Sequence, residues 1–378
     1  MSLASPMRVA LIQTQAENAG AQQISRLIAA DLAARGHDVR QIFFFRRTAS
    51  FDAAANVAFC ASERPRGPLS FLRFLANLYR TLRDIRPDAV VTFQHYGNVI
   101  GAPIARLAGA KRVVVNQVSA GAMMAPWGVS ADKLLGSLGA YDRIVVNSDY
   151  TEAMFATYPA RYRGRMLRID HGFEDKTAGI GKAEARAGLG LPGNVALIGC
   201  AARLHRLKQL DAAIAVLPLI EGAHLALAGQ GEDRQRLETL ARDLGVEARV
   251  HFVGELAPEA IGQFLAALDC FVFPSGAETF GLAPVEAAQA GLPVVANGLD
   301  VLQEVLSVEG EPCAIFADAR DTAAFAAAVK NVLDDPALAA KLGAAGRRLK
   351  GRYPLTAMTD AYADLVETLT RDRDARRR

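Results

Sequence analysis

Short apolar runs alternate with helical segments along nearly the whole chain, and this alternation constrains the fold more than any other feature. The runs are rich in β-branched residues, show no strict apolar–polar alternation, and end in Gly, Asn, Ser or Pro. Strands buried on both faces of a parallel sheet have this pattern. Because helical segments separate the runs, the sequence predicts an α/β fold with crossover connections.

The predicted strands fall into two series of about six each. The first series is 8–13, 39–44, 89–94, 113–116, 143–147 and 166–169, and the second is 195–201, 224–228, 250–253, 270–274, 293–297 and 313–316. A chain of 378 residues is long enough for two or three domains. We therefore predict two doubly wound domains that face a central cleft, with ligands bound beyond the carboxyl ends of the strands.

The domain boundary is expected where a Gly-, Lys- and Ala-rich stretch, 175–192, separates the two series. We assign residues 1–178 to the first domain and 179–353 to the second. Two helices, 336–350 and 355–370, follow the last strand. The final segment, 354–378, is predicted to be a helix that crosses back to the first domain and ends in a charged tail.

Several classes of protein are excluded by composition. The longest apolar runs have about six residues, whereas a membrane-spanning helix needs about 20. The first eight residues are too short and too polar for a signal peptide. The four cysteines are scattered, with no Cys-x-x-Cys pair and no His/Cys cluster. This favours a protein of the reducing cytoplasm that has no disulfide framework and no metal site.

The charge is distributed unevenly. Residues 1–180 contain 22 Lys/Arg and 14 Asp/Glu, and residues 181–378 contain 21 and 26. The basic half either faces an anionic partner, such as a membrane or an acidic acceptor, or reflects ordinary scatter. In the helical segment 68–86 the apolar positions lie opposite Arg73 and Arg80. This favours a helix packed on the sheet over a membrane-surface helix. No nucleic-acid partner is expected.

The segment Glu278-Thr-Phe-Gly-Leu-Ala-Pro-Val-Glu286 is the strongest candidate for a binding site. It follows a predicted strand and opens a helix, with a proline suited to the first helical turn. Backbone amides at such a helix start favour anions. Two carboxylates eight positions apart suit hydrogen bonding to sugar hydroxyls. The alternative is that Glu286 complements the helix dipole and Glu278 is an ordinary loop residue.

A second candidate is the strand-to-helix junction that contains Arg203 and Lys208. A guanidinium and an ammonium group can together hold a diphosphate and stabilise it as it leaves. The alternative is a solvated basic loop. Gly229 and Gly231 mark a later tight turn, and Gly20 follows the first strand. Each of these glycines is weak evidence of a phosphate site when taken alone.

Together these segments resemble the retaining glycosyltransferases of family 4, which have the GT-B fold of two Rossmann-like domains. The stretch 273–287 matches the Glu-x7-Glu signature of that family, and Arg203 and Lys208 match its Arg-Leu-x-x-x-Lys diphosphate clamp. The turn at Gly229 and the stretch 250–254 match its next two strand ends. Ile169-Asp-His-Gly-Phe-Glu174 stands where the family usually has Pro-Asn-Gly-Val-Asp.

The resemblance implies a role for each matching residue. The implied catalytic residues are Arg203, Lys208 and Glu278. The implied donor-binding residues are Gly20, Arg203, Lys208, Gly229, Phe252, Gly254, Glu278, Thr279, Phe280, Gly281, Leu282 and Glu286. Among these, Glu286 is expected to bind the ribose, Glu278 the sugar, and the stretch 252–256 the base. The two cations make a metal cofactor unnecessary.

The chain departs from the family pattern where many members have a histidine after the fourth strand of the first domain. Here the stretch reads Val115-Asn-Gln-Val-Ser119. Gln117 and Ser119, or His95 with its neighbour Tyr96, are the candidates for contact with the sugar or the acceptor.

The sequence as a whole therefore predicts a cytoplasmic, metal-independent retaining glycosyltransferase. Its donor would be a UDP- or GDP-linked sugar. Its acceptor would be a glycan or lipid-linked molecule of bacterial cell-surface polysaccharide or lipopolysaccharide synthesis, with peripheral contact to the inner membrane. The alternatives are a nucleotide-sugar 2-epimerase of the same fold and a non-catalytic sugar-nucleotide binder. A nicotinamide oxidoreductase is disfavoured because the first half lacks the glycine fingerprint.

Overall fold

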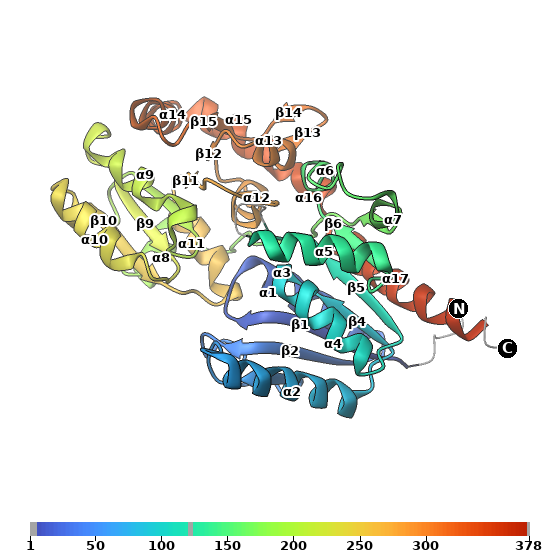
Figure 1. Cartoon of the computed structure of the whole chain (residues 1–378). Coiled ribbons are helices and arrows are strands. Elements are labelled where there is room, and N and C mark those ends of the chain that lie inside the picture. Colours follow the sequence, from blue (N-terminus) through green and yellow to red (C-terminus); the bar gives the residue numbers. More distant parts are fainter. Residues whose placement is uncertain (1–5, 120–123, 376–378) are drawn as a thin grey trace. The chain divides into compact units, whose positions relative to one another are not determined.

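The chain forms two compact units, shown in the computed structural model of Figure 1. The structure describes residues 6–119 and 124–375, with side chains described up to residue 371. Unit 1 comprises Met1–Gly172 with Leu355–Arg378, and unit 2 comprises Phe173–Pro354. The boundaries predicted from the sequence lay after residues 178 and 353.

Unit 1 is built on a seven-stranded parallel sheet with the strand order β3-β2-β1-β4-β5-β6-β7. Its strands are β1 (Arg8–Ala16), β2 (Asp38–Arg46), β3 (Val57–Ala61), β4 (Ala89–Thr92), β5 (Arg112–Asn116), β6 (Arg143–Val146) and β7 (Met166–Arg168). Seven strands agree with the predicted series of about six, but β3 is not among the runs singled out in the sequence. This edge strand is only partly buried, so it lacks the continuous apolar run that marks the central strands.

Helices cover the sheet of unit 1. They are α1 (Gly20–Ala34), α2 (Pro68–Ile85), α3 (Gln94–Tyr96), a π-helical turn (Gly97–Gly101), α4 (Ala102–Leu107), α5 (Pro126–Leu138), α6 (Asp149–Ala153), α7 (Ala160–Arg163) and α17 (Leu355–Ala375). Helices α2 and α4 lie beside each other (Figure 1). Phe74, Leu78 and Leu82 of α2 are buried and join the core of this unit.

The C-terminal helix α17 returns to unit 1 and packs against α1 and β5. The side chain of Arg112 donates to the carbonyl oxygen of Leu369 at 2.6 Å. The hydroxyl group of the buried Tyr362 donates to the side-chain oxygen of Asn116. These contacts join the last helix to the middle of the sheet. Residues 376–378 of the predicted charged tail lie outside the described residues.

Unit 2 has a six-stranded parallel sheet in the order β10-β9-β8-β11-β12-β15. Its strands are β8 (Leu197–Ala201), β9 (His224–Ala228), β10 (Val250–Gly254), β11 (Cys270–Phe273), β12 (Val294–Asn297) and β15 (Ile315–Ala317), and a small antiparallel pair is formed by β13 (Ser307–Val308) and β14 (Glu311–Pro312). All six strands of the second predicted series are found.

The helices of unit 2 are mostly short. They are α8 (Lys182–Gly188), α9 (Leu210–Ala215), α10 (Arg234–Asp243), α11 (Ile261–Ala267), α12 (Leu282–Gln289), α13 (Asp300–Val305), α14 (Thr322–Asp334), α15 (Pro336–Arg347) and α16 (Leu349–Arg352). The predicted single helix over 336–350 is divided at Arg348 into α15 and α16. Short 3₁₀ turns follow β8 and β10, at Arg206–Lys208 and Pro258–Ala260.

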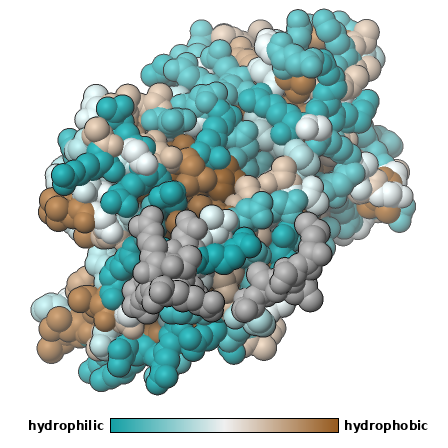
Figure 2. Space-filling model, turned by 90° about the vertical axis from the view of Figure 1, so that its right-hand side faces the viewer, coloured by the Kyte–Doolittle hydropathy of each residue, from teal (hydrophilic) through white to brown (hydrophobic). Residues whose placement is uncertain are grey.

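The two parallel sheets with crossover helices confirm the predicted α/β class of two Rossmann-like domains. Among the described residues, no helix has the length and apolarity needed to span a bilayer. The face drawn in Figure 2 is largely hydrophilic, and its apolar areas form separate patches.

Candidate functional site

The loop that carries Arg203 begins where β8 ends and is held by main-chain hydrogen bonds to the loop after β9. The amide of Ala202 donates to the carbonyl of Ala228 at 2.9 Å, and that of Leu204 donates to the carbonyl of Gln230 at 3.0 Å. Arg203 itself is partly buried. The backbone that presents Arg203 is therefore fixed by the neighbouring strand end.

Two glycines allow these loops to approach each other so closely. Gly229 has φ +139°, and a Cβ placed there would lie 2.0 Å from the carbonyl oxygen of Ala202. A Cβ at Gly231 would lie 2.1 Å from the carbonyl oxygen of Leu204. Any side chain at either position would push away the loop on which Arg203 sits. The close packing of the two loops explains why both positions require glycine, which the sequence motif alone does not explain.

Lys208 and Glu278, predicted as two separate parts of the site, form an ion pair. Their Nζ and Oε1 atoms lie 2.5 Å apart, and their side chains are 23% and 11% exposed. The ammonium group also lies 5.6 Å from the centre of the Phe273 ring, a cation–π geometry. The structure thus brings together a cation and a carboxylate that arise 70 positions apart in the chain.

The loop before Glu278 is tied to the loop before Lys208. The amide of Gly276 donates to the carbonyl of Leu207 at 2.8 Å, and the hydroxyl of the buried Ser275 donates to the same carbonyl at 3.3 Å. Asn297, at the end of β12, donates from its side-chain amide to the carbonyl of Ser275 at 3.0 Å. Three hydrogen bonds to main-chain carbonyls therefore hold the two loops that carry the ion pair.

The start of α12 is formed by buried and partly buried residues. Gly281, the N-cap, has φ +91°, which favours glycine. Phe280 is buried against the rings of Phe173 and Tyr353, with centroid separations of 6.0 and 5.4 Å. Thr279 and Leu282 are partly buried. This arrangement suits backbone recognition of an anion, the role implied for 280–282.

Glu286 lies on the second turn of α12. Part of its side chain remains accessible, but the surrounding protein removes the carboxyl group from water and raises its pKa to about 7. The positive charge of Lys176 opposes this effect, whereas the negative charge of Glu174 adds to it. A carboxyl group with such a pKa is the kind of residue that occurs at functional sites.

The predicted base-lining stretch lies at the end of β10. The guanidinium group of Arg234 stacks over the Phe252 ring at 4.8 Å. Gly254 has φ +86°, with open space where a Cβ would stand. The carbonyl oxygen of Gly254 accepts from the amide of Gly229 at 2.7 Å. This bond joins the β10 end to the turn that supports the Arg203 loop.

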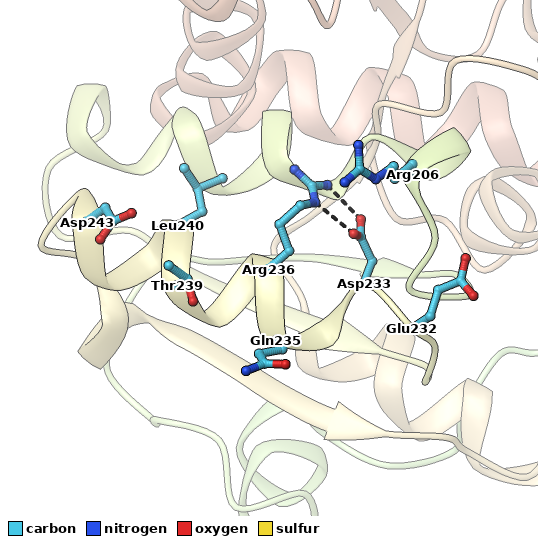
Figure 3. Close-up of a pocket in the computed structure, with 8 residues that line it drawn as sticks. All are labelled: Arg206, Glu232, Asp233, Gln235, Arg236, Thr239, Leu240 and Asp243. Atoms are coloured by element: carbon cyan, nitrogen blue, oxygen red, sulfur yellow. Dashed lines mark hydrogen bonds and ion pairs between the residues drawn. The ribbon is translucent and has the colours of Figure 1, made fainter.

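A groove of 720 Å³ lies on unit 2 next to the loop that carries the clamp residues (Figure 3). Its lining comprises Arg206, Glu232, Asp233, Gln235, Arg236, Thr239, Leu240 and Asp243. Arg236 forms a two-pronged ion pair with Asp233, at 2.7 and 2.6 Å. The amide of Asp233 also donates to the carbonyl of Leu204 at 3.2 Å. The start of α10 therefore anchors the loop from its outer side.

The acceptor-side candidates lie in unit 1. Neither ring nitrogen of the buried His95 has a hydrogen-bond partner among the described residues, and burial lowers the pKa of its imidazole. The His95 amide donates to the hydroxyl oxygen of Ser119 at 3.0 Å. Tyr96 is half-buried, and Gly20 is exposed at the first position of α1. Two of the residues predicted to contact the sugar or the acceptor, His95 and Ser119, are therefore neighbours.

Gln117 is placed differently from its expected position. It is buried, and its side-chain amide donates to the carboxylate of Asp132 at 3.0 Å and to the hydroxyl oxygen of Tyr162 at 2.7 Å. These partners belong to α5 and α7. The side-chain amide of Gln117 is therefore hydrogen-bonded inside the core of unit 1, and not placed as the contact to sugar or acceptor that the sequence suggested.

Among the described residues, no three or more His, Cys, Asp or Glu side chains are placed to hold a metal ion. All four cysteines are free and buried. Burial raises the pKa of the Cys200 thiol, on β8, to about 12. That thiol is therefore no nucleophile at neutral pH.

Sequence reasoning missed Lys176, which acts electrostatically on Glu286. Its ammonium group donates to Glu174 at 2.9 Å and to the carbonyl of Pro258 at 3.1 Å. No local pattern marks a single lysine in the segment between the two strand series. Only the three-dimensional structure brings it near α12.

Two family models together match most of the chain. The model described as "Glycosyl transferase 4-like domain" matches residues 19–161, and that described as "Glycosyl transferases group 1" matches residues 181–349. The chain belongs to the GT-B glycosyltransferases of the family 4 type. The resemblance seen in the Glu-x7-Glu signature is thereby confirmed.

Curated relatives of this glycosyltransferase act in several pathways. One is the lipopolysaccharide core biosynthesis glycosyltransferase LpsD of Rhizobium meliloti, 35% identical over 48% of this chain and 52% of that protein. Another is a GDP-mannose-dependent phosphatidylinositol monomannoside mannosyltransferase of Mycobacterium tuberculosis, 32% identical over 65% of this chain and 66% of that protein. The match to LpsD spans only about half of the relative's length.

Solved structures share the whole fold. HepE of Anabaena, in complex with UDP and glucose, superposes with a TM-score of 0.81 at 20% identity and covers 96% of this chain and 100% of its own. WaaG, a glycosyltransferase involved in lipopolysaccharide biosynthesis, gives 0.76 at 19% identity, covering 95% and 99%. At these identities the likeness establishes the GT-B fold.

The close approach at Gly229 generates the first prediction. An unfavourable positive φ costs about 1–2 kcal/mol by itself. The Gly229→Ala variant should destabilise the protein by more than this, because its Cβ would also clash with the Ala202 carbonyl oxygen. Gly222→Ala is the matched control, since Gly222 has φ +69° and open space around it. Chemical denaturation measures both. Equal losses in the two variants would contradict the packing role of Gly229.

Proposed function

We propose that this chain is a retaining glycosyltransferase that moves a sugar from a nucleotide-diphosphate sugar to a glycan or lipid-linked acceptor. The observation that carries the proposal is the Lys208–Glu278 ion pair in unit 2. A cation for a diphosphate and a carboxylate for sugar hydroxyls are the two groups that such a donor requires. The UDP and glucose bound by HepE, a protein of the same fold, support this choice of donor.

In the proposed donor site, Arg203 and Lys208 neutralise the diphosphate, and the amides of 280–282 support it. Glu278 and Thr279 bind the sugar, and Glu286 accepts hydrogen bonds from the ribose. Gly229, Phe252 and Gly254 line the base. From unit 1, Gly20 serves the diphosphate, and His95, Tyr96 and Ser119 serve the acceptor. Because two cations carry the charge of the leaving group, we propose that the reaction needs no metal.

The proposed transfer retains the configuration of the anomeric carbon. The acceptor hydroxyl attacks that carbon from the face on which the diphosphate leaves. The new glycosidic bond forms as the bond to the phosphate oxygen breaks, and a phosphate oxygen takes the proton of the hydroxyl. The protein then contributes by positioning and by stabilising the charge that develops on the diphosphate.

The donor class is tested by thermal unfolding with UDP, GDP, ADP and their sugar conjugates, with and without EDTA. A ligand at 100 times its dissociation constant should stabilise the protein by about 2.7 kcal/mol. We expect one nucleotide to raise the melting temperature, with no effect of EDTA and with the shift lost in Glu286→Ala. No shift with any nucleotide would overturn the proposed donor site.

The clamp generates a separate prediction on turnover. Replacing Arg203 or Lys208 by Met should slow sugar transfer by about 10²–10³-fold, as the loss of one oxyanion donor does. Arg206→Met is the matched control, because Arg206 is an exposed cation on the same loop but lines the 720 Å³ groove of Figure 3. Rates are measured with saturating donor. Equal rates for Arg203→Met and the wild type would contradict the mechanism, and an equal loss in Arg206→Met would point to a general charge effect.

We further propose that the acceptor belongs to bacterial cell-surface glycan synthesis and that the enzyme works at the cytoplasmic face of the membrane. The similarity to LpsD and WaaG supports the acceptor class. Helix α2 supports membrane contact. Three of its apolar side chains, Leu69, Phe71 and Leu72, are 78%, 42% and 61% exposed. Six exposed arginines lie on α2 or in the residues next to its ends: Arg64, Arg66, Arg73, Arg80, Arg83 and Arg86.

Co-sedimentation with vesicles tests this contact. We expect binding to phosphatidylglycerol-containing vesicles, weakened by 0.5 M NaCl, because exposed arginines attract anionic lipid by about 1 kcal/mol each. Leu69→Ser and Leu72→Ser should weaken binding, whereas Leu219→Ser, an exposed leucine of unit 2, should not. Equal binding to phosphatidylcholine vesicles, or equal loss in the control, would contradict a role for α2.

A further inference from the structure

Lys176 is fixed at both its side chain and its backbone. Its side chain is only 9% exposed, and its ammonium group donates to a carboxylate oxygen of Glu174 at 2.9 Å and to the carbonyl oxygen of Pro258 at 3.1 Å. Gly262, in the first turn of α11, packs on its backbone, since a Cβ there would lie 2.8 Å from the Lys176 carbonyl oxygen. These contacts hold both the side chain and the backbone of Lys176 in one place.

The contacts of Lys176 join separate parts of unit 2. Glu174 belongs to the segment that enters the unit, and Pro258 opens the 3₁₀ turn that follows β10. This turn comes directly after the stretch 252–256, which we assign to the base. Lys176 therefore holds the chain just after the base-lining stretch.

The third connection of Lys176 is electrostatic and reaches Glu286 on α12. Burial raises the pKa of this carboxyl group to about 7, and the Lys176 charge acts against that rise. Of the other cations on the helices packed against α12, Lys341 is exposed to solvent, and the remaining three have contacts elsewhere. Lys350 donates to Asp175 at 2.8 Å, Arg352 donates to the carbonyl of Glu304 at 2.8 Å, and Arg347 contacts Gly291 beyond the end of α12. Helix α11 carries no charged residue.

We propose that Lys176 is a positioning residue of the donor site, which holds the chain at Pro258, just after the base-lining stretch, and whose positive charge favours the ionised form of the Glu286 carboxyl group. This inference rests on the proposed function and deepens it. An ionised carboxylate accepts hydrogen bonds from two ribose hydroxyls, whereas a protonated carboxyl group loses acceptor capacity. Donor binding should therefore strengthen as Glu286 loses its proton, and Lys176 sets the pH at which this happens.

The first test needs no nucleotide. The Glu286 carboxyl carbon is followed by NMR in ¹³C-glutamate-labelled protein, and its resonance is assigned by its absence in Glu286→Gln. Lys176→Met should raise the titration midpoint by about half a pH unit or more, because a favourable positive charge is removed. Glu174→Gln is the matched variant and should lower the midpoint, because it removes the opposing negative charge. Shifts of opposite sign distinguish an electrostatic role from general loosening of the site.

The second test measures affinity for UDP-glucose and GDP-mannose between pH 6 and pH 9. For a midpoint near 7, affinity should rise about tenfold over this range in the wild type, about thirtyfold in Lys176→Met and about fourfold in Glu174→Gln. It should stay flat in Glu286→Gln. Because each value is a ratio of affinities at two pH values for one variant, it does not depend on any pH-independent loss of affinity that a shift of the loop at Pro258 would cause.

The two tests separate failure of this inference from failure of the proposed function. Unchanged midpoints in both charge variants, or affinity profiles parallel to that of the wild type, would overturn the role of Lys176 while leaving the donor site in place. If the midpoints move as expected but neither donor binds at any pH, the inference about nucleotide binding is overturned together with the proposed function.

Discussion

The ion pair between Lys208 and Glu278 is the interaction on which the candidate site depends. Its two members come from loops after different strands, and the Leu207 carbonyl joins those loops by accepting from the Gly276 amide and the Ser275 hydroxyl group. The pair is largely withdrawn from water, so removing one partner would leave a poorly solvated charge. A diphosphate sugar offers replacement partners for both, a phosphate for the lysine and hydroxyls for the glutamate. The free protein thus holds these two groups close together for the donor that we propose.

The remaining parts of the site are placed by backbone geometry. Gly229 and Gly231 let one loop lie directly against the loop of Arg203, and Gly281 begins α12 in a conformation that favours glycine. The ring of Phe280 packs in the core against Tyr353. Such a site is built from strand ends of a rigid parallel sheet, where α/β proteins place their ligands.

Most of the fold could be predicted from the sequence because buried parallel strands leave continuous apolar runs. The edge strand β3 was missed because its half-buried residues leave no such run. The Glu278–Glu286 spacing and the Arg203–Lys208 junction could be recognised because each lies within one short segment. The contacts of Lys176 could not, because they join residues far apart in the chain. Gln117 was placed near the sugar by its position after β5, but its side chain lies among core partners that no local pattern indicates.

The most direct test of this account is a crystal structure with an intact, slowly reacting nucleotide-diphosphate sugar bound. We predict that Lys208 and Arg203 lie within hydrogen-bond distance of the diphosphate, Glu278 of the sugar hydroxyls and Glu286 of the ribose. The Lys208–Glu278 pair would then be bridged or opened by the donor. A donor bound elsewhere, with this ion pair unchanged and untouched, would contradict the account.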